Sequence, residues 1–140
     1  MNNTTHLKKP HQKIIIFINI MKIMAKHKTE EHDFQCECVK WYRETFPEGI
    51  IFAVPNCGAR NIGTYYYMIN EGMTPGAPDL VLAKPDGKVI FVEMKSTKGR
   101  LSENQKSIQS QCENISSKLY FVCRSVEEFK SLFKSYLSRV

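Results

Sequence analysis

The sequence has no apolar run long enough to cross a bilayer. Its longest candidate, Ile14 to Ile23, is interrupted by Asn19 and Lys22, whereas a spanning helix needs about 20 mainly apolar residues. A basic start and a short apolar run are also typical of a secretion signal, but no small-x-small cleavage site follows them. The sequence therefore argues against both membrane insertion and export.

Cysteines paired at metal-binding spacing are also absent, because no C-x-x-C motif occurs. An odd number of cysteines without an export signal favours reduced thiols. On a helix Cys36 and Cys38 would lie about 200° apart and could not easily share a metal. We interpret the cysteines as small apolar residues of the core; the five are Cys36, Cys38, Cys57, Cys112 and Cys123.

Most of the chain carries no net positive charge, although the net charge of the whole chain is +6. Residues 1–28 contain six lysines and no acidic residue, which leaves 14 basic and 14 acidic residues from Thr29 onward. The overall charge therefore does not predict nucleic-acid binding, and only a local cluster of cations could.

At 140 residues the chain has room for one hydrophobic core. We expect residues 1–28 to form a basic leader that is disordered or lies outside the core, with Met24 as an alternative start of translation. Residues 29–140 should then form a single domain.

The first predicted helix begins at Thr29, which can cap it ahead of an acidic first turn. Glu31 lies on the apolar stripe of this helix with Phe34, Gln35, Cys38 and Tyr42. An inward carboxylate needs a partner, because an unpaired buried charge is costly. The alternative is that Glu31 is only a partly exposed first-turn acid.

A tight hairpin is predicted around Lys84-Pro85-Asp86-Gly87-Lys88, where proline and glycine favour a turn. With Lys84 opposite Lys88, the register places Asp79 opposite Glu93. Directly opposed residues have Cβ atoms about 4.5–5.5 Å apart, and two carboxylates that close repel each other. A hard divalent cation such as Mg²⁺ would remove the repulsion. Lys95 points to the same face as Glu93.

Both faces of the hairpin are largely apolar, so we expect the sheet to be covered on both sides. Lys95, Lys98 and Arg100 follow the second strand within six residues, and Ser102 and Gln105 fit a capping box that opens the next helix. This loop is either a local phosphate-binding patch or a solvated turn.

The remaining segments predict short elements around the hairpin. Residues 50–54 suggest a buried strand, followed by a polar loop in which Arg60 either contacts phosphate or is a solvated cation. Residues 64–71 suggest a helix whose three consecutive tyrosines either pack inward in part or stack on bases. Residues 119–123 suggest a third core strand, and a last helix capped by Ser125 buries its apolar stripe as far as Leu137.

The order of these elements is α-β-α-β-β-α-β-α, an α/β fold with a small mixed sheet flanked by helices. Asp79 followed by Glu93-x-Lys95 across a hairpin resembles the PD-(D/E)xK nuclease superfamily. The longer pattern is more specific and resembles the VRR-NUC (virus-type replication-repair nuclease) family over about residues 30–136. Its motif residues are Gly76, Pro78, Asp79, Leu80, Val92, Glu93, Lys95, Lys98, Gly99, Arg100, Leu101, Ser102 and Gln105.

The resemblance implies a restriction-endonuclease-like core and a metal-dependent DNA endonuclease. Asp79, Glu93 and the backbone carbonyl of Met94 would bind Mg²⁺ or Mn²⁺, and Glu31 would complete the shell directly or through water. Glu31 and Gln35 also match the Glu-x-x-x-Gln start of this helix in the family.

Lys95 would orient the attacking water, while Lys98, Arg100 and Gln105, with Arg60, would hold the DNA backbone. No base-reading element is present, which favours selectivity for branched or flap DNA. The catalytic prediction thus comprises Glu31, Asp79, Glu93, Lys95 and Gln105.

The resemblance further implies replication, repair or recombination of a phage or bacterium, a cytoplasmic location (the host cytoplasm if viral), no membrane partner, and a homodimer as one assembly. Two other functions stay open: an inactive nucleic-acid-binding module on a nuclease fold, and a nuclease that acts on RNA.

Overall fold

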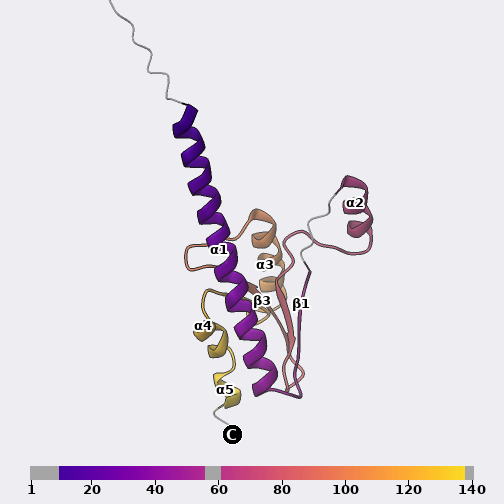
Figure 1. Cartoon of the computed structure of the whole chain (residues 1–140). Helices are drawn as coiled ribbons and strands as arrows, with labels where there is room; N and C mark the ends of the chain where they lie inside the picture. The colour runs from indigo at the N-terminus through magenta and orange to yellow at the C-terminus, as the bar shows by residue number, and fades with distance from the viewer. Residues whose placement is uncertain (1–9, 56–60, 138–140) are drawn as a thin grey trace, which may run out of the picture.

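The computed structural model describes residues 10–55 and 61–137. The elements, shown in Figure 1, are α1 (Pro10–Thr45), β1 (Ile50–Ala53), α2 (Ile62–Asn70), β2 (Leu80–Ala83), β3 (Val89–Met94), α3 (Glu103–Ile115), β4 (Tyr120–Cys123), α4 (Val126–Ser131) and α5 (Lys134–Leu137). Their order is the predicted one up to the last helix, which is divided into α4 and α5.

The four strands form one mixed sheet in the order β1-β2-β3-β4. β1, β2 and β3 are antiparallel neighbours, and β4 is parallel to β3. Leu80 pairs with Val92, and the hairpin is closed by a bond from the Lys84 N–H to the Lys88 carbonyl (2.8 Å). The predicted hairpin register is therefore confirmed.

One face of the sheet carries the hydrophobic core, beneath α1 and α4. Its centre is a group of aromatic rings whose centroids lie 5.3–6.1 Å apart: Trp41, Tyr42, Phe46, Phe129 and Phe133. The Tyr42 hydroxyl donates to the Ala83 carbonyl (3.1 Å), which ties α1 to the end of β2. This packing fixes the angle at which α1 crosses the sheet.

The opposite face is covered only in part, contrary to the prediction. α3 lies on it near β4, where Cys112 and Tyr120 are buried. Towards β1 the face is open, and Ile50 and Phe52 are 60% and 51% exposed. A single helix cannot cover four strands, so the site described below lies on a face that is partly accessible.

Helix α1 begins at Pro10, so the prediction that a helix starts after a Thr29 cap is wrong. No proline or glycine occurs between Pro10 and Pro47, so nothing breaks the helix at residue 29, and proline is well tolerated at a first helical position. Residues 10–28 are thus helical rather than disordered, although the apolar side chains described there, such as Ile16 and Ile23, are exposed. Figure 1 shows this half of α1 extending beyond the sheet.

Deletion of residues 1–23, so that the chain starts at Met24, is expected to leave the thermal midpoint of unfolding within a few degrees of that of the full chain. The core residues that α1 contributes begin at Phe34, and surface changes outside a core usually alter stability by less than about 0.5 kcal/mol. Calorimetry on both chains tests this. A loss of more than about 10 °C would show that the first half of α1 stabilises the domain.

The last helix breaks at Leu132 and Phe133, where successive N–H groups bond three residues back, to Phe129 and Lys130. This tighter turn keeps Phe129 and Phe133 fully buried, whereas Leu137, predicted to be buried, is 44% exposed. The Tyr136 side chain lies outside the described residues.

Helix α2 has no buried residue, so the prediction that one or two of its tyrosines pack inward is wrong. Tyr65, Tyr66 and Tyr67 are all exposed, because α2 stands apart from the sheet on the far side of β1 (Figure 1). Base stacking by these rings stays a prediction.

The cysteine prediction is confirmed for Cys38, Cys112 and Cys123, which are buried, and wrong for Cys36, which is exposed; Cys57 lies outside the described residues. Burial raises the pKa of the Cys38 and Cys123 thiols to about 12, which keeps them protonated.

Candidate active site

Two carboxylates, one half-buried (Asp79) and one fully buried (Glu93), meet at the open end of the β2–β3 hairpin. Asp79 directly precedes β2, and Glu93 is the fifth residue of β3 and only 1% exposed. Continuing the observed register places them opposite each other. Asp79 is held from two sides: its carbonyl accepts from the Val54 N–H (2.9 Å), and its Oδ2 accepts from the Met94 N–H (2.8 Å).

The hairpin ladder stops at Met94 for a reason visible in the sequence. In the same register Met94 lies opposite Pro78, and a proline has no N–H to donate. The Met94 carbonyl therefore has no donor from Pro78 and lies at the end of the ladder. The Met94 N–H donates to the Asp79 carboxylate.

Glu93 has one satisfied and one unsatisfied carboxylate oxygen. Its Oε1 accepts from Lys95 Nζ at 2.8 Å and from the side-chain amide of Gln105. Its Oε2 is buried and has no hydrogen-bond partner among the described residues. A buried carboxylate oxygen without a partner is costly, which marks this atom as a place for a cation or a water molecule.

Gln105 connects the N-terminus of α3 to this carboxylate. The predicted capping box is confirmed: Ser102 accepts from the Gln105 N–H, and the Gln105 Oε1 accepts from the Ser102 N–H (2.9 Å). With its oxygen so engaged, the amide nitrogen of the same side chain points at Glu93. Gln105 thus caps the start of α3 and orients the acid.

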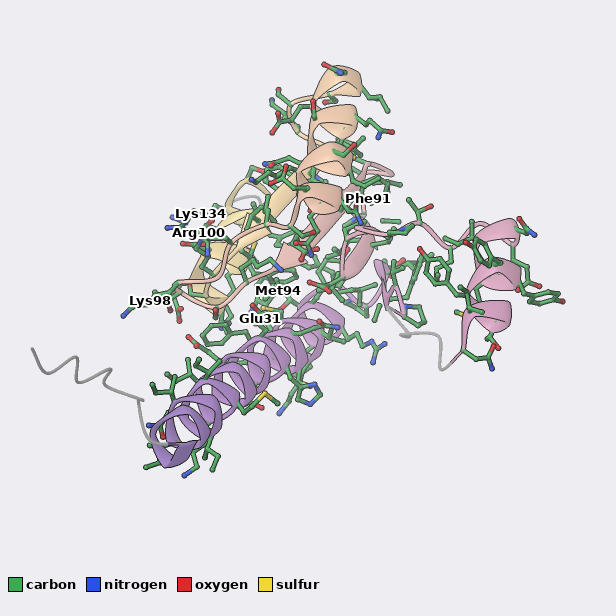
Figure 2. The ribbon with its side chains drawn as sticks, turned by 90° about the horizontal axis from the view of Figure 1, so that it is seen from above. Glu31, Phe91, Met94, Lys98, Arg100 and Lys134 are labelled. Atoms are coloured by element: carbon green, nitrogen blue, oxygen red, sulfur yellow. The ribbon has the colours of Figure 1, made fainter. Side chains whose placement is uncertain are left out.

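Glu31 reaches the site from α1, and its inward orientation is confirmed. Its Oε1 accepts from the Ser96 N–H at 2.9 Å, just beyond β3, so its partner is a backbone amide. Glu31 lies well inside α1, so the alternative is wrong about a first turn, although Glu31 is partly exposed as that alternative expected. Figure 2 labels Glu31 on α1, and its bond to the Ser96 N–H places it at the end of β3.

Arg124 belongs to the same assembly and was not predicted. Its Nη1 donates to the carbonyls of Ser96 (2.9 Å) and Gly99 (2.6 Å), which fixes the loop that carries Lys98 and Arg100. A lone arginine at the end of β4 gives no sequence signal for this role, because the contact spans 25–28 residues.

Burial raises the pKa of both acids, and Lys95 acts against it. Burial raises the pKa of Glu93 to about 7, against the hydrogen bond from Lys95, and the Asp79 and Glu31 charges raise it further. Burial likewise raises the pKa of Asp79, against the Met94 N–H and the charge of Lys95. Lys95, whose side chain is only 12% exposed, is the cation closest to this pair in the described chain.

Tyr120 is a second unpredicted neighbour. Its hydroxyl is buried without a partner among the described residues. Burial raises its pKa, and the Glu93 and Asp79 charges add to the shift. Its hydroxyl therefore lies within electrostatic reach of the carboxylates.

The predicted DNA-contacting residues lie around this centre. Lys98 and Arg100 are exposed, and Figure 2 shows Lys98 extending away from the body of the protein. Arg60 lies outside the described residues. The structure thus brings Glu31, Asp79, Glu93, Lys95 and Gln105 together; their chemical roles stay predictions.

The donor set suits a hard divalent cation, since Asp79, Glu93 and the Met94 carbonyl offer oxygen ligands. The orphaned Glu93 Oε2 is the observation that fits such an ion. Among the described residues no three histidine, cysteine, aspartate or glutamate side chains form a ready metal cluster. Glu31 uses its Oε1 to accept from the Ser96 N–H, so any part it takes in a metal shell, directly or through water, would fall to its other carboxylate oxygen.

Comparison with known proteins agrees with this geometry. The family model of the VRR-NUC domain matches residues 19–127. The chain is a member of the VRR-NUC family. The match includes every described residue of the site and begins inside α1, which agrees with a helix that starts before Thr29.

Comparison with solved structures also finds the VRR-NUC fold. A solved VRR-NUC domain aligns with 71% of this chain and 94% of its own, with a TM-score of 0.50 and 22% sequence identity; at this identity the likeness shows the fold alone. No curated protein sequence gives a significant match. In the described part of this VRR-NUC chain, no helix has the length and apolar content needed for a bilayer crossing.

Proposed function

We propose that this VRR-NUC domain is a metal-dependent DNA endonuclease. The observation that carries the proposal is the pairing of Asp79 and Glu93 across the hairpin, with Lys95 in contact with Glu93 and one Glu93 oxygen left without a partner. A purely structural sheet gains nothing from an acid at Asp79 opposite the buried Glu93, because desolvation raises the pKa of both carboxyl groups.

Asp79, Glu93 and the Met94 carbonyl would hold Mg²⁺ or Mn²⁺, with Glu31 contributing directly or through water. When bound, such an ion polarises the scissile phosphate and lowers the pKa of the attacking water. Gln105 holds Glu93 in place, and Met94 does the same for Asp79 through its N–H.

Lys95 orients the attacking water and stabilises the negative charge that develops on the phosphate. Its ammonium group is already desolvated and placed beside Glu93, so little reorganisation is needed as charge develops. Lys98 and Arg100, on the loop clamped by Arg124, bind flanking phosphates and position the strand without reading bases.

The substrate we propose is branched DNA, such as a flap or a four-way junction, in replication, repair or recombination of a phage or bacterium. Two features support this choice. The cations near the site are suited to contacting DNA phosphates, and the described residues include no element that would read bases in a groove. A homodimer in the cytoplasm is part of the same proposal.

The deciding experiment is a cleavage assay with Mg²⁺ or Mn²⁺, with EDTA as the metal-free control. The substrates are a duplex, a flap, a four-way junction and an RNA of matched sequence. Metal-dependent cleavage of the branched DNAs supports the proposal. Binding without cleavage in either metal would support an inactive binding module, and preferential cleavage of the RNA would support an RNA nuclease.

Replacement of Lys95 by methionine is expected to lower kcat about 10²–10³-fold, the usual cost of losing one preorganised charge-stabilising donor. Methionine keeps the apolar stem, so the loop should stay in place. Isothermal titration with Mn²⁺ should show that metal binding is retained. Lys40→Met, which removes an exposed cation from α1, is the matched control and should cleave normally.

A further inference from the structure

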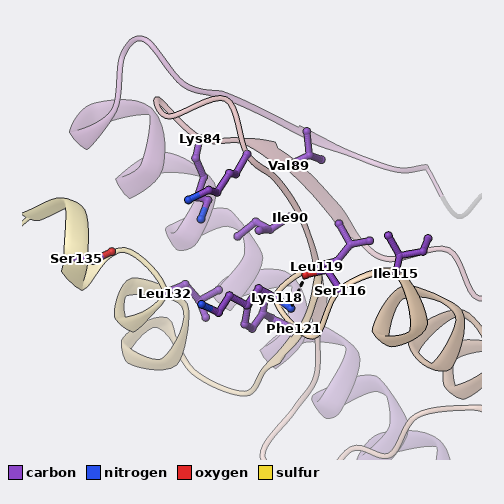
Figure 3. A pocket seen from close by; sticks show the side chains of 11 residues that line it. Lys84, Val89, Ile90, Ile115, Ser116, Lys118, Leu119, Phe121, Leu132 and Ser135 are labelled. Carbon is purple, nitrogen blue, oxygen red and sulfur yellow. Dashed lines mark hydrogen bonds between the residues drawn. The ribbon is translucent and has the colours of Figure 1, made fainter.

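A second pocket lies away from the candidate active site. It has a volume of about 590 Å³ and lies between the hairpin, the start of β4 and the break between α4 and α5. Leu132 and Ser135 line it because the last helix is interrupted there (Figure 3). The volume is within the range of about 300–1,000 Å³ that is usual for ligand sites.

The floor of this pocket is apolar. Ile90, Leu119 and Phe121 from the paired starts of β3 and β4 line it, together with Leu132. At its mouth Ile115, the last residue of α3, is 79% exposed. Apolar surface gathered in a concavity favours burial of an apolar group from another molecule.

The rim of the pocket is basic. Lys84, Lys88 and Lys118 line it, and no aspartate or glutamate is among the described lining residues. Figure 3 shows Lys84 and Lys118 approaching from opposite sides, with Ile90 between them. Lys88 Nζ is 3.1 Å from Asp86 Oδ2, but an exposed ion pair of this kind contributes little and exchanges readily.

This basic pocket is distinct from the active site. Ile90 and Glu93 lie on opposite faces of β3, because they are an odd number of residues apart. The active site is at the Met94 end of the strand and the pocket at the Val89 end. A ligand of the pocket would therefore leave the carboxylates accessible.

We propose that the basic pocket binds an acidic peptide segment of a partner protein, one that carries a large apolar side chain. The carboxylates would contact Lys84, Lys88 and Lys118, and the apolar side chain would cover the partly exposed Phe121 and Leu132. A nucleic-acid backbone would satisfy the lysines but has no aliphatic group to bury, so it would leave the floor in water. The proposal does not depend on nuclease activity.

The test uses the full chain and a fluorescein-labelled octapeptide of five aspartates, two leucines and a phenylalanine, followed by fluorescence anisotropy. We expect saturable binding that weakens as salt is added. Lys84→Glu and Lys118→Glu should each lower the affinity at least about tenfold, since a charge-assisted contact becomes a repulsion. Lys40→Glu, with the same change of charge on exposed α1, should bind normally.

A peptide with its leucines and phenylalanine replaced by serine tests the apolar floor and should bind at least about tenfold more weakly. Circular dichroism checks that the variants are folded. Equal binding by the Lys84→Glu and Lys40→Glu chains, or equal binding of the serine peptide, overturns the proposal. So does a finding that Lys118→Glu weakens duplex DNA binding as much as peptide binding, because the pocket would then be a nucleic-acid contact.

Discussion

Replacement of Asp79 by asparagine is expected to lower the cleavage rate by about 10³-fold or more. A metal-polarised phosphate is worth several kcal/mol of transition-state stabilisation, and each 1.36 kcal/mol corresponds to a factor of ten in rate. Asparagine can still accept the Met94 N–H through its side-chain oxygen, so the hairpin end should keep its shape. Single-turnover cleavage of a four-way junction in Mg²⁺ measures the loss.

The same substitution should stabilise the metal-free chain at neutral pH. Burial raises the pKa of Asp79 and takes that of Glu93 from 4.5 to about 7, so the folded chain binds these protons more tightly than the unfolded chain does. Stability in EDTA should therefore fall as the pH rises from about 4.5 to about 7, as the acids ionise in the fold. Asp79→Asn should flatten this fall.

Asp86→Asn is the matched control, because Asp86 is an exposed aspartate at the opposite end of the same hairpin. It should cleave at the wild-type rate. Two results would contradict the site: full activity in Asp79→Asn, or a stability in EDTA that drops by several kcal/mol, which would make Asp79 a structural residue.

Replacement of Gly76 by alanine is expected to destabilise the domain and to lower cleavage together. Gly76 has a φ of +86°, and an added Cβ would lie 2.5 Å from the Asn104 carbonyl carbon and 2.7 Å from the Gln105 N. Both are backbone atoms of the first turn of α3, so the clash cannot be relieved by a side chain. The helix start must move, and Gln105 moves with it, away from Glu93.

The expected cost is more than about 2 kcal/mol, since the strained backbone alone accounts for about 1–3 kcal/mol and the clash adds to it. Gly87→Ala is the matched control: its φ is +79°, and nothing lies within 4 Å of an added Cβ. Urea unfolding and cleavage on both variants separate the two effects. Equal losses in Gly76→Ala and Gly87→Ala would show that strain alone matters and that contact with α3 does not.

Much of the site could be predicted because its geometry is local. A hairpin of five turn residues sets the register of its strands, so the positions of Asp79, Glu93 and Lys95 follow from counting residues. Gln105 could be placed for the same reason, since a capping box is a short-range pattern. The VRR-NUC family match then agrees with the motif.

The contacts that cross the fold could not be predicted. Nothing near Arg124 in the sequence indicates that it clamps the carbonyls of Ser96 and Gly99. Gly76 belongs to the predicted motif, but only the structure shows that the backbone at the start of α3 lies against it. Local preference was also misleading: Thr29 is a good cap, but an unbroken run of helix-compatible residues continues through it.

The sequence by itself determined which residues share a strand face and where the chain turns, because alternation and turn chemistry act over a few residues. Only the tertiary structure decided which helix covers which face, which carboxylate oxygen stays unsatisfied, and that a break between α4 and α5 opens a basic pocket. These outcomes depend on how separate elements pack, and packing is settled by the volume and burial of many side chains at once.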